Sequence, residues 1–218
     1  MKKMIALGVG AMLAMALVFL GPEALDLYRL DQYISASDKA NQEDGGPWPR
    51  ATDACIGCHG VQGNSQHQGY PSLAGQPAAY VAAQLHSFAS GKRANPNMAP
   101  LAANMSDAEI KAYADYFAKQ TALENSSFTP DATLVDKGRQ LATAQCVACH
   151  GERLMGRELF PRLAGQGHDY LLVQLDAYAD GKRKDPSGAM NGIAAALSVG
   201  DRKAVASYLA SLAPKKGE

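Results

Sequence analysis

The sequence predicts an all-α protein of two tandem domains, preceded by an apolar helix at its N-terminus. Three observations lead to this prediction: a repeat with an offset of about 90 residues, apolar residues at helical spacing within each copy, and the lack of alternating β-branched runs. The chain has 218 residues, of which 47% are hydrophobic and 19% charged. This composition supports a packed core and excludes a chain that is disordered throughout.

The first 21 residues have the composition of a membrane anchor or a secretory signal. Two lysines precede an uncharged stretch at residues 4–21, which would be about 27 Å long as a helix. The stretch ends without the small-x-small pattern of a cleavage site, so we favour a retained anchor over a cleaved signal. Because the lysines stay inside, both alternatives place residues 22–218 on the periplasmic side of the bacterial inner membrane. Residues 22–50 are then a stalk or tether.

An internal repeat organises the rest of the chain. The repeated blocks are Cys-x-x-Cys-His-Gly at 55–60 and 146–151, Pro-x-Leu-Ala-Gly-Gln at 71–76 and 161–166, and Gly-Lys-Arg at 91–93 and 181–183. Single positions also correspond, such as Tyr80 and Tyr170, Gln84 and Gln174, Met98 and Met190, and Ser106 and Ser198. We therefore predict one domain at residues 51–122, a linker at 123–130 and a second domain at 131–214.

Each copy has the pattern of a short helical bundle. Apolar spacing predicts helices at residues 76–90 and 166–180, each followed by a glycine. Serine-headed capping patterns predict a final helix in each copy, at 106–120 and 198–213. A further helix at 134–145 leads into the second cysteine motif.

All four cysteines lie in Cys-x-x-Cys-His motifs, the attachment signature of c-type haem. Two thiols three residues apart share one helical turn and can add to the two vinyl groups of a porphyrin, while the adjacent histidine ligates the iron. A disulfide or a shared four-cysteine zinc site is the alternative, but either leaves both histidines without a role. The sequence therefore predicts two haem c groups, held by Cys55, Cys58 and His59 and by Cys146, Cys149 and His150.

Methionine is the predicted sixth ligand of both irons, because Met/His ligation raises the potential of a haem. The first copy offers Met98 and Met105, whereas the second offers only Met190 in this region. Met190 aligns with Met98, and Met105 aligns with Leu197. We therefore predict Met98 and Met190 as ligands and Met105 as a core residue.

Several residues around the motifs are candidates for supporting roles. A ligating histidine usually donates its second ring N–H to a carbonyl, and Pro71 and Pro161 follow their histidines at a suitable distance. Arg162 either pairs with a haem propionate or lies on the surface. Arg93 and Arg183 belong to loops that form a docking patch or are simply solvated.

Together, these duplicated motifs resemble the cytochrome c4 family of dihaem cytochromes c over about residues 51–214. The resemblance implies two class I cytochrome c domains related by pseudo-twofold symmetry, with haem edges and propionates meeting at their interface. It also implies a periplasmic protein, soluble or membrane-attached, that carries electrons towards terminal oxidases, often of the cbb3 type. The chain departs from the family at residues 45–49, which leave little room for a helix before the first cysteine motif.

The predicted function is the transfer of single electrons between redox proteins. Upstream we expect a quinol-oxidising complex or a dehydrogenase, and downstream a terminal oxidase. Two six-coordinate irons leave no open site, so we expect neither enzyme activity nor a small-molecule substrate. Equal numbers of basic and acidic residues, 21 each, argue against a nucleic-acid partner. The alternatives are the electron-accepting subunit of a dihaem enzyme such as thiosulfate dehydrogenase, and a haem enzyme with an open site.

Overall fold

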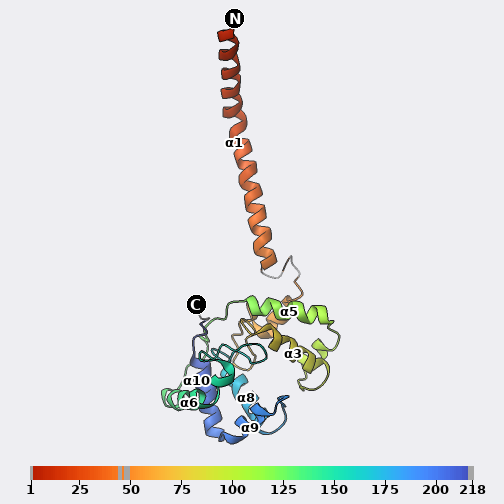
Figure 1. Cartoon of the computed structure of the whole chain (residues 1–218), viewed down its shortest axis with the longest axis vertical. Helices are drawn as coiled ribbons and strands as arrows, with labels where there is room; N and C mark the ends of the chain where they lie inside the picture. The colour runs from red at the N-terminus through yellow and green to blue at the C-terminus, as the bar shows by residue number, and fades with distance from the viewer. Residues whose placement is uncertain (1, 44–45, 47–49, 216–218) are drawn as a thin grey trace. The chain divides into compact units, whose positions relative to one another are not determined.

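The computed structural model describes residues 2–43, 46 and 50–215, and its contacts divide the chain into two units, Met1–Arg50 and Ala51–Glu218 (Figure 1). In the first unit, α1 (Lys2–Glu43) is one helix of 42 residues that contains Pro22. Residues 22–43 of the predicted tether are therefore helical.

Among the residues that the structure describes, no helix is both long and apolar enough to cross a membrane. The predicted anchor covers residues 4–21. Apart from Met15, Leu20 and Gly21, the side chains of this stretch lie outside the described residues.

The second unit contains two successive sets of helices. The first set is α2 (Asp53–His59), the 3₁₀ helix η1 (Val61–Gly63), α3 (Ala78–Ala89), α4 (Met98–Ala102) and α5 (Asp107–Lys119). The second set is α6 (Ala132–Gln145), α7 (Val147–His150), α8 (His168–Ala179), α9 (Ala189–Ala196) and α10 (Val199–Ser211). The described residues form no β-strand, and the prediction of an all-α fold is confirmed.

The predicted helices appear as α3, α5, α6, α8 and α10, with ends within a few residues of the expected ones. The short helices α4 and α9 were not predicted. They have five and eight residues, which is too short for a clear apolar period. The methionines that the repeat singles out lie at the start of these helices, since Met98 is the first residue of α4 and Met190 the second of α9.

The last helix of each set begins with a capping box. Ser106 Oγ accepts the Glu109 N–H at 3.3 Å, while the Glu109 carboxylate accepts the Ser106 N–H at 2.8 Å. Ser198 and Asp201 form the same pair of bonds at the start of α10. Two amide groups that helix geometry leaves without partners are thereby satisfied at each site, which fixes where α5 and α10 begin.

Each set of helices encloses its own apolar core. In the first set, α3 and α5 pack face to face, and the buried residues are Val81, Leu85, Phe88, Ala102, Ile110 and Ala114. In the second set, the buried residues are Leu154, Ala164, Leu171, Leu197, Val205, Ala206, Leu209 and Ala210. Cys146 and Val147 of the second Cys-x-x-Cys-His segment pack against the second core.

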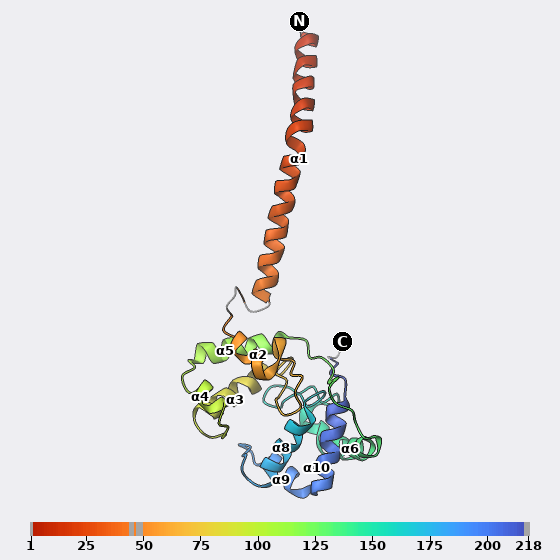
Figure 2. The ribbon, with the colours of Figure 1, turned by 180° about the vertical axis from the view of Figure 1, so that it is seen from behind.

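Helix α6 packs against α10, and both views show the two side by side (Figures 1 and 2). At the crossing, a Cβ on Gly138 would lie 2.1 Å from the Ala204 carbonyl oxygen, so the helices approach closely only because residue 138 is glycine. Residues 50–52, which directly precede α2, form no such helix in the first set. Ala112, which corresponds to Ala204, is accordingly exposed, whereas Ala204 is fully buried.

We expect Gly138→Ala to lower the free energy of unfolding by about 1–3 kcal/mol, because the new methyl group forces α6 away from α10. Urea unfolding of the holoprotein measures the change. Gly200→Ala is the matched control, since the site is exposed and the nearest atom to its Cβ is Ser198 Oγ at 3.9 Å. Gly200→Ala is expected to raise the free energy of unfolding by about 0.5–1 kcal/mol. Equal effects of the two substitutions would contradict the close crossing.

Candidate haem-binding sites

The first site is built on α2, which carries Cys55, Cys58 and His59 within two turns. The chain leaves the helix at Gly60, where φ is +76°. A Cβ on Gly60 would lie 1.9 Å from the Asn64 carbonyl oxygen. Glycine therefore lets the chain turn away directly after His59, which leaves that histidine as the last residue of the helix.

The second site lies where α6 meets α7. Cys146 is the residue between the two helices and has φ −104° and ψ −35°, while Cys149 and His150 lie on α7. Gly151 follows with φ +83°, as Gly60 follows His59. Both copies thus present two cysteines three residues apart, followed by a histidine at a helix end.

The two histidines are buried, with exposed fractions of 7% for His59 and 5% for His150. His59 Nδ1 lies 2.8 Å from the Pro71 carbonyl oxygen, and His150 Nδ1 lies 2.9 Å from that of Pro161. A carbonyl only accepts, so Nδ1 carries the proton and Nε2 keeps its lone pair. Burial lowers the pKa of both rings, although the proline hydrogen bonds oppose this. A neutral imidazole with a free Nε2 is the form that ligates a metal.

All four cysteines are free thiols. Burial raises the pKa of Cys55, with help from Asp53, and raises the pKa of Cys146 to about 11. The raised pKa values disfavour the thiolate form at Cys55 and Cys146. The described residues also contain no group of three or more His, Cys, Asp or Glu side chains that could hold a metal ion, so the shared zinc site is not formed. These residues fit a porphyrin that supplies its own ring nitrogens to the iron.

Met98 and Met190 both lie at the start of a short helix, α4 and α9. Met98 and Met105 are both half-buried against the first core, and Met155 packs against the second. Met190 is half-buried at the start of α9. The roles of Met98 and Met190 as ligands stay predictions.

Arg162 is among the most buried side chains, with an exposed fraction of 1%. Its Nε donates to the Ala74 carbonyl at 3.1 Å, its Nη2 to that of Ser72 at 3.3 Å, and its Nη1 to that of Ala164. The expectation of a surface position is wrong for this residue. Burial lowers its pKa to about 10, so it stays charged near neutral pH. Pairing with a haem propionate stays a prediction, and the bonds in the structure tie the second repeat to the backbone of the first.

Removing this guanidinium by Arg162→Met is expected to lower the free energy of unfolding by about 2–3 kcal/mol, because buried carbonyls lose their donors. Exposed Arg157 is the matched control, as its guanidinium donates to the Ala148 carbonyl at 3.2 Å. Arg157→Met should change the unfolding free energy by less than about 0.5 kcal/mol. Urea unfolding compares the two variants, and equal losses would show that the Arg162 contacts do not hold the domains together.

Arg93 and Arg183 lie at the interface between the two repeats, so neither belongs to a solvated loop or an exposed docking patch. Each guanidinium reaches both Gln84 and Gln174 and the tyrosine of the other repeat. The bonds are Arg93 to Gln84 at 2.6 Å, Gln174 at 2.8 Å and Tyr170 at 3.1 Å, and Arg183 to Gln174 at 2.7 Å, Gln84 at 2.9 Å and Tyr80 at 3.1 Å. The equal pattern from each side gives this interface a local pseudo-twofold symmetry.

This arginine pair concentrates positive charge at the interface. In the part of the chain that the structure describes, neither guanidinium is paired with a carboxylate. Burial raises the pKa of Tyr170, but Arg93 and Arg183 outweigh this effect and hold that pKa below its usual value. The repeat pairs Tyr170 with Tyr80 and Gln174 with Gln84, but it gives no sign that these residues meet at a domain interface.

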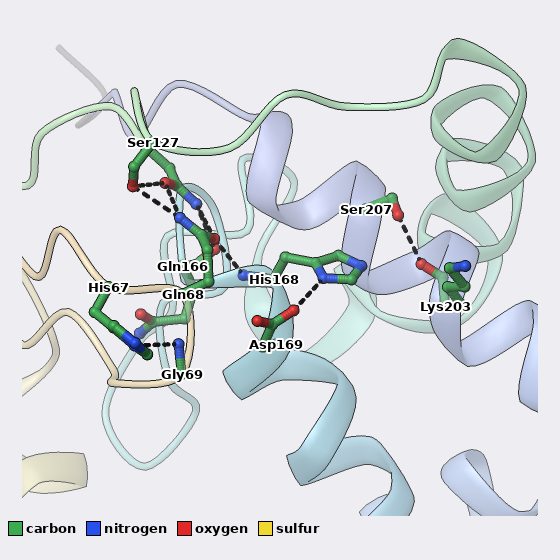
Figure 3. Close-up of polar contacts among 10 residues, drawn as sticks. His67, Gln68, Gly69, Ser127, Gln166, His168, Asp169, Lys203 and Ser207 are labelled. Carbon is green, nitrogen blue, oxygen red and sulfur yellow. Dashed lines mark hydrogen bonds and ion pairs between the residues drawn. The ribbon is translucent and has the colours of Figure 1, made fainter.

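The linker is also tied to both repeats. Gln68 Nε2 donates to Asn125 Oδ1 and Ser127 Oγ, both at 2.8 Å, while its Oε1 accepts the His168 N–H at 2.9 Å (Figure 3). The Tyr170 N–H donates to the Gln68 carbonyl at 2.9 Å. The loop around Gln68 therefore contacts the linker and the start of α8 together.

Two family models match the chain. The model described as cytochrome c matches residues 135–213, and the model described as cytochrome c oxidase, cbb3-type, subunit III matches residues 48–117. Each match covers one of the two repeats, from the region before the Cys-x-x-Cys-His motif to the last helix.

Curated relatives and a solved structure match both repeats together. The chain is 39% identical to a thiosulfate dehydrogenase electron acceptor of Stutzerimonas stutzeri (strain A1501), over 79% of this chain and 84% of that protein. It is 37% identical to cytochrome c4 of Thiocapsa roseopersicina, over 75% of this chain and 89% of that protein. The crystal structure of reduced recombinant cytochrome c4 from Pseudomonas stutzeri matches with a TM-score of 0.68 and 31% identity, over 74% of this chain and 94% of that chain.

The cytochrome c4 relatives and the two Cys-x-x-Cys-His sites of this chain both indicate two haem c groups. The chain is an electron-transfer protein and not an enzyme, so the alternative of a haem enzyme with an open site is wrong. It belongs to the cytochrome c4 family of dihaem c-type cytochromes and carries two covalently attached haem c groups.

Proposed function

We propose that the chain carries single electrons between redox proteins on the periplasmic side of the bacterial inner membrane. His59 and Met98 would ligate one iron and His150 and Met190 the other, and each bound haem supplies a one-electron couple. The observation that carries this proposal is the repeated arrangement of a buried histidine with its Nδ1 bonded to a proline carbonyl, directly after two free cysteines.

The protein's own groups suit such a carrier. The proline carbonyls hold each imidazole in one tautomer and one orientation, which keeps a ligand in place when the charge of its metal changes. Arg93 and Arg183 offer positive charge at the domain interface without a carboxylate partner among the described residues. This charge supports a position of the haem carboxylates near the interface, as the family resemblance implies.

We place this carrier between a quinol-oxidising complex or a dehydrogenase and a terminal oxidase, with a cbb3-type oxidase as one candidate. A second partner is favoured by the relatives named as thiosulfate dehydrogenase electron acceptors, which are 39% and 36% identical to this chain. The domains predicted at residues 51–122 and 131–214 would each hold one haem in both cases.

Stopped-flow mixing separates the two partners. The oxidised holoprotein is mixed with thiosulfate dehydrogenase and thiosulfate, and the reduced holoprotein with a cbb3-type oxidase. We expect electron transfer with at least one partner to be much faster than with an unrelated single-haem cytochrome c of similar potential. Rates no faster than that control with both partners would contradict the proposed partners.

Membrane attachment is a separate part of the proposal. A retained N-terminus would tether both domains near membrane-bound partners, whereas cleavage would release them into the periplasm. Intact-mass spectrometry of protein from a haem-maturing bacterial host measures the difference. A mass that includes residues 1–21 supports the tether, and a mass without them contradicts it.

A further inference from the structure

We propose that Gln76 and Gln166 are positioning residues that act across the domain interface, each through a peptide group that accepts the hydrogen bond of the other domain's histidine. Each glutamine would thereby help to set the redox potential of the haem in the opposite domain. The inference rests on the proposed roles of His59 and His150 as iron ligands.

The relay to the first site begins in the second repeat. Gln166 Oε1 accepts the Ser72 N–H at 2.6 Å. That nitrogen and the Pro71 carbonyl belong to one peptide group, and the carbonyl oxygen lies 2.8 Å from His59 Nδ1. One peptide group thus connects the amide of Gln166 to the imidazole of His59.

The relay to the second site has equivalent bonds and begins in the first repeat. Gln76 Oε1 accepts the Arg162 N–H at 2.9 Å, and the Pro161 carbonyl of the same peptide group lies 2.9 Å from His150 Nδ1. Each glutamine also donates from Nε2 to the next carbonyl along, that of Ser72 at 3.0 Å or that of Arg162 at 2.9 Å. Both side chains therefore hold the opposite segment at two points.

Water is excluded from these bonds. The exposed fractions are 3% for Gln76, 2% for Gln166, 8% for Ser72 and 1% for Arg162. In such a setting, hydrogen bonds in series polarise one another, with a strengthening of roughly 10–30% per bond. A peptide N–H that donates to glutamine has a more negative carbonyl oxygen, which draws the Nδ1 proton more strongly. The imidazole then becomes more electron-rich and favours the oxidised iron.

The test is spectroelectrochemical titration of the Gln166→Leu and Gln76→Leu holoproteins. Gln166→Leu should raise the potential of the His59 haem, in the other domain, and leave the His150 haem unchanged. We expect about a threefold shift of the redox equilibrium, or about 28 mV at 59 mV per tenfold change. Gln76→Leu should do the same to the His150 haem. The Nδ1–H signals of the two histidines in NMR spectra of the reduced protein identify which site has changed.

Gln68→Leu is the matched control. Gln68 also bonds to the linker at Asn125 and across the interface to the His168 N–H, but among the described residues no hydrogen bond joins it to either proline peptide. This variant should shift neither potential. If Leu at residue 76 or 166 prevents folding, methionine keeps the length of the side chain and removes the same hydrogen bonds.

Three outcomes decide the question. A crossed pattern, with each glutamine shifting only the opposite haem, supports the relay. Unchanged potentials, or equal shifts in all three variants, overturn the relay. The proposed function still stands in that case if the unsubstituted protein has two low-spin haems. If the unsubstituted protein lacks a low-spin haem pair ligated by His59 and His150, the ligand assignment and the relay fail together.

Discussion

Replacing Cys146 and Cys149 together by alanine is expected to halve the covalently bound haem, from two groups per chain to one. These cysteines sit three residues apart at the junction of α6 and α7, so their loss removes both thioether bonds of one site. The first site keeps Cys55 and Cys58 on α2. Haem absorbance per chain and the mass of the denatured protein both measure the change.

The reciprocal replacement of Cys55 and Cys58 is the control for this experiment. It should also leave one covalent haem, now attached in the second domain. Peptide mapping after proteolysis shows which motif keeps its haem. If either double variant retained two covalent haems, the cysteines would not be the attachment sites.

Replacing Met98 or Met190 by alanine is expected to open one iron to carbon monoxide and to lower its potential. Loss of the thioether would remove the proposed ligand, which favours the reduced iron. Because axial ligands move haem potentials across a span of about 0.8 V, we expect a fall on the order of 0.1 V. Carbon monoxide difference spectra and a redox titration of each holoprotein measure the two effects.

Met105→Ala is the matched control for the first domain, since Met105 is half-buried against the same core as Met98. It should create a cavity and lower the unfolding free energy by about 2–5 kcal/mol, without opening the iron. Carbon monoxide binding in Met105→Ala but not in Met98→Ala would reverse the ligand assignment.

The repeat made most of the second unit predictable. Helices with a clear apolar face and a cap, such as α5 and α10, begin within one residue of their expected positions because the serine caps mark the start. The two histidines and their prolines follow from motif spacing, since a ligating imidazole needs a carbonyl at its second nitrogen. Local chemistry alone determines these features.

Contacts between the repeats could not be predicted in the same way. Arg162 aligns with Ser72, so the repeat gave no hint that its guanidinium crosses the interface. Arg93 and Arg183 follow a glycine in a polar loop, a pattern typical of solvated residues. Their burial depends on how two folded domains meet, and helical period and capping patterns carry no information about that packing.

The visible spectrum of the purified holoprotein, recorded oxidised, reduced and reduced with carbon monoxide, tests the central claim most directly when haem is counted per chain. We predict two covalent low-spin haems per chain and no spectral change with carbon monoxide, because in the proposed sites a histidine and a methionine would both ligate each iron. Carbon monoxide binding at either haem, or a single haem per chain, would contradict the assignment of the protein as a carrier with two closed sites.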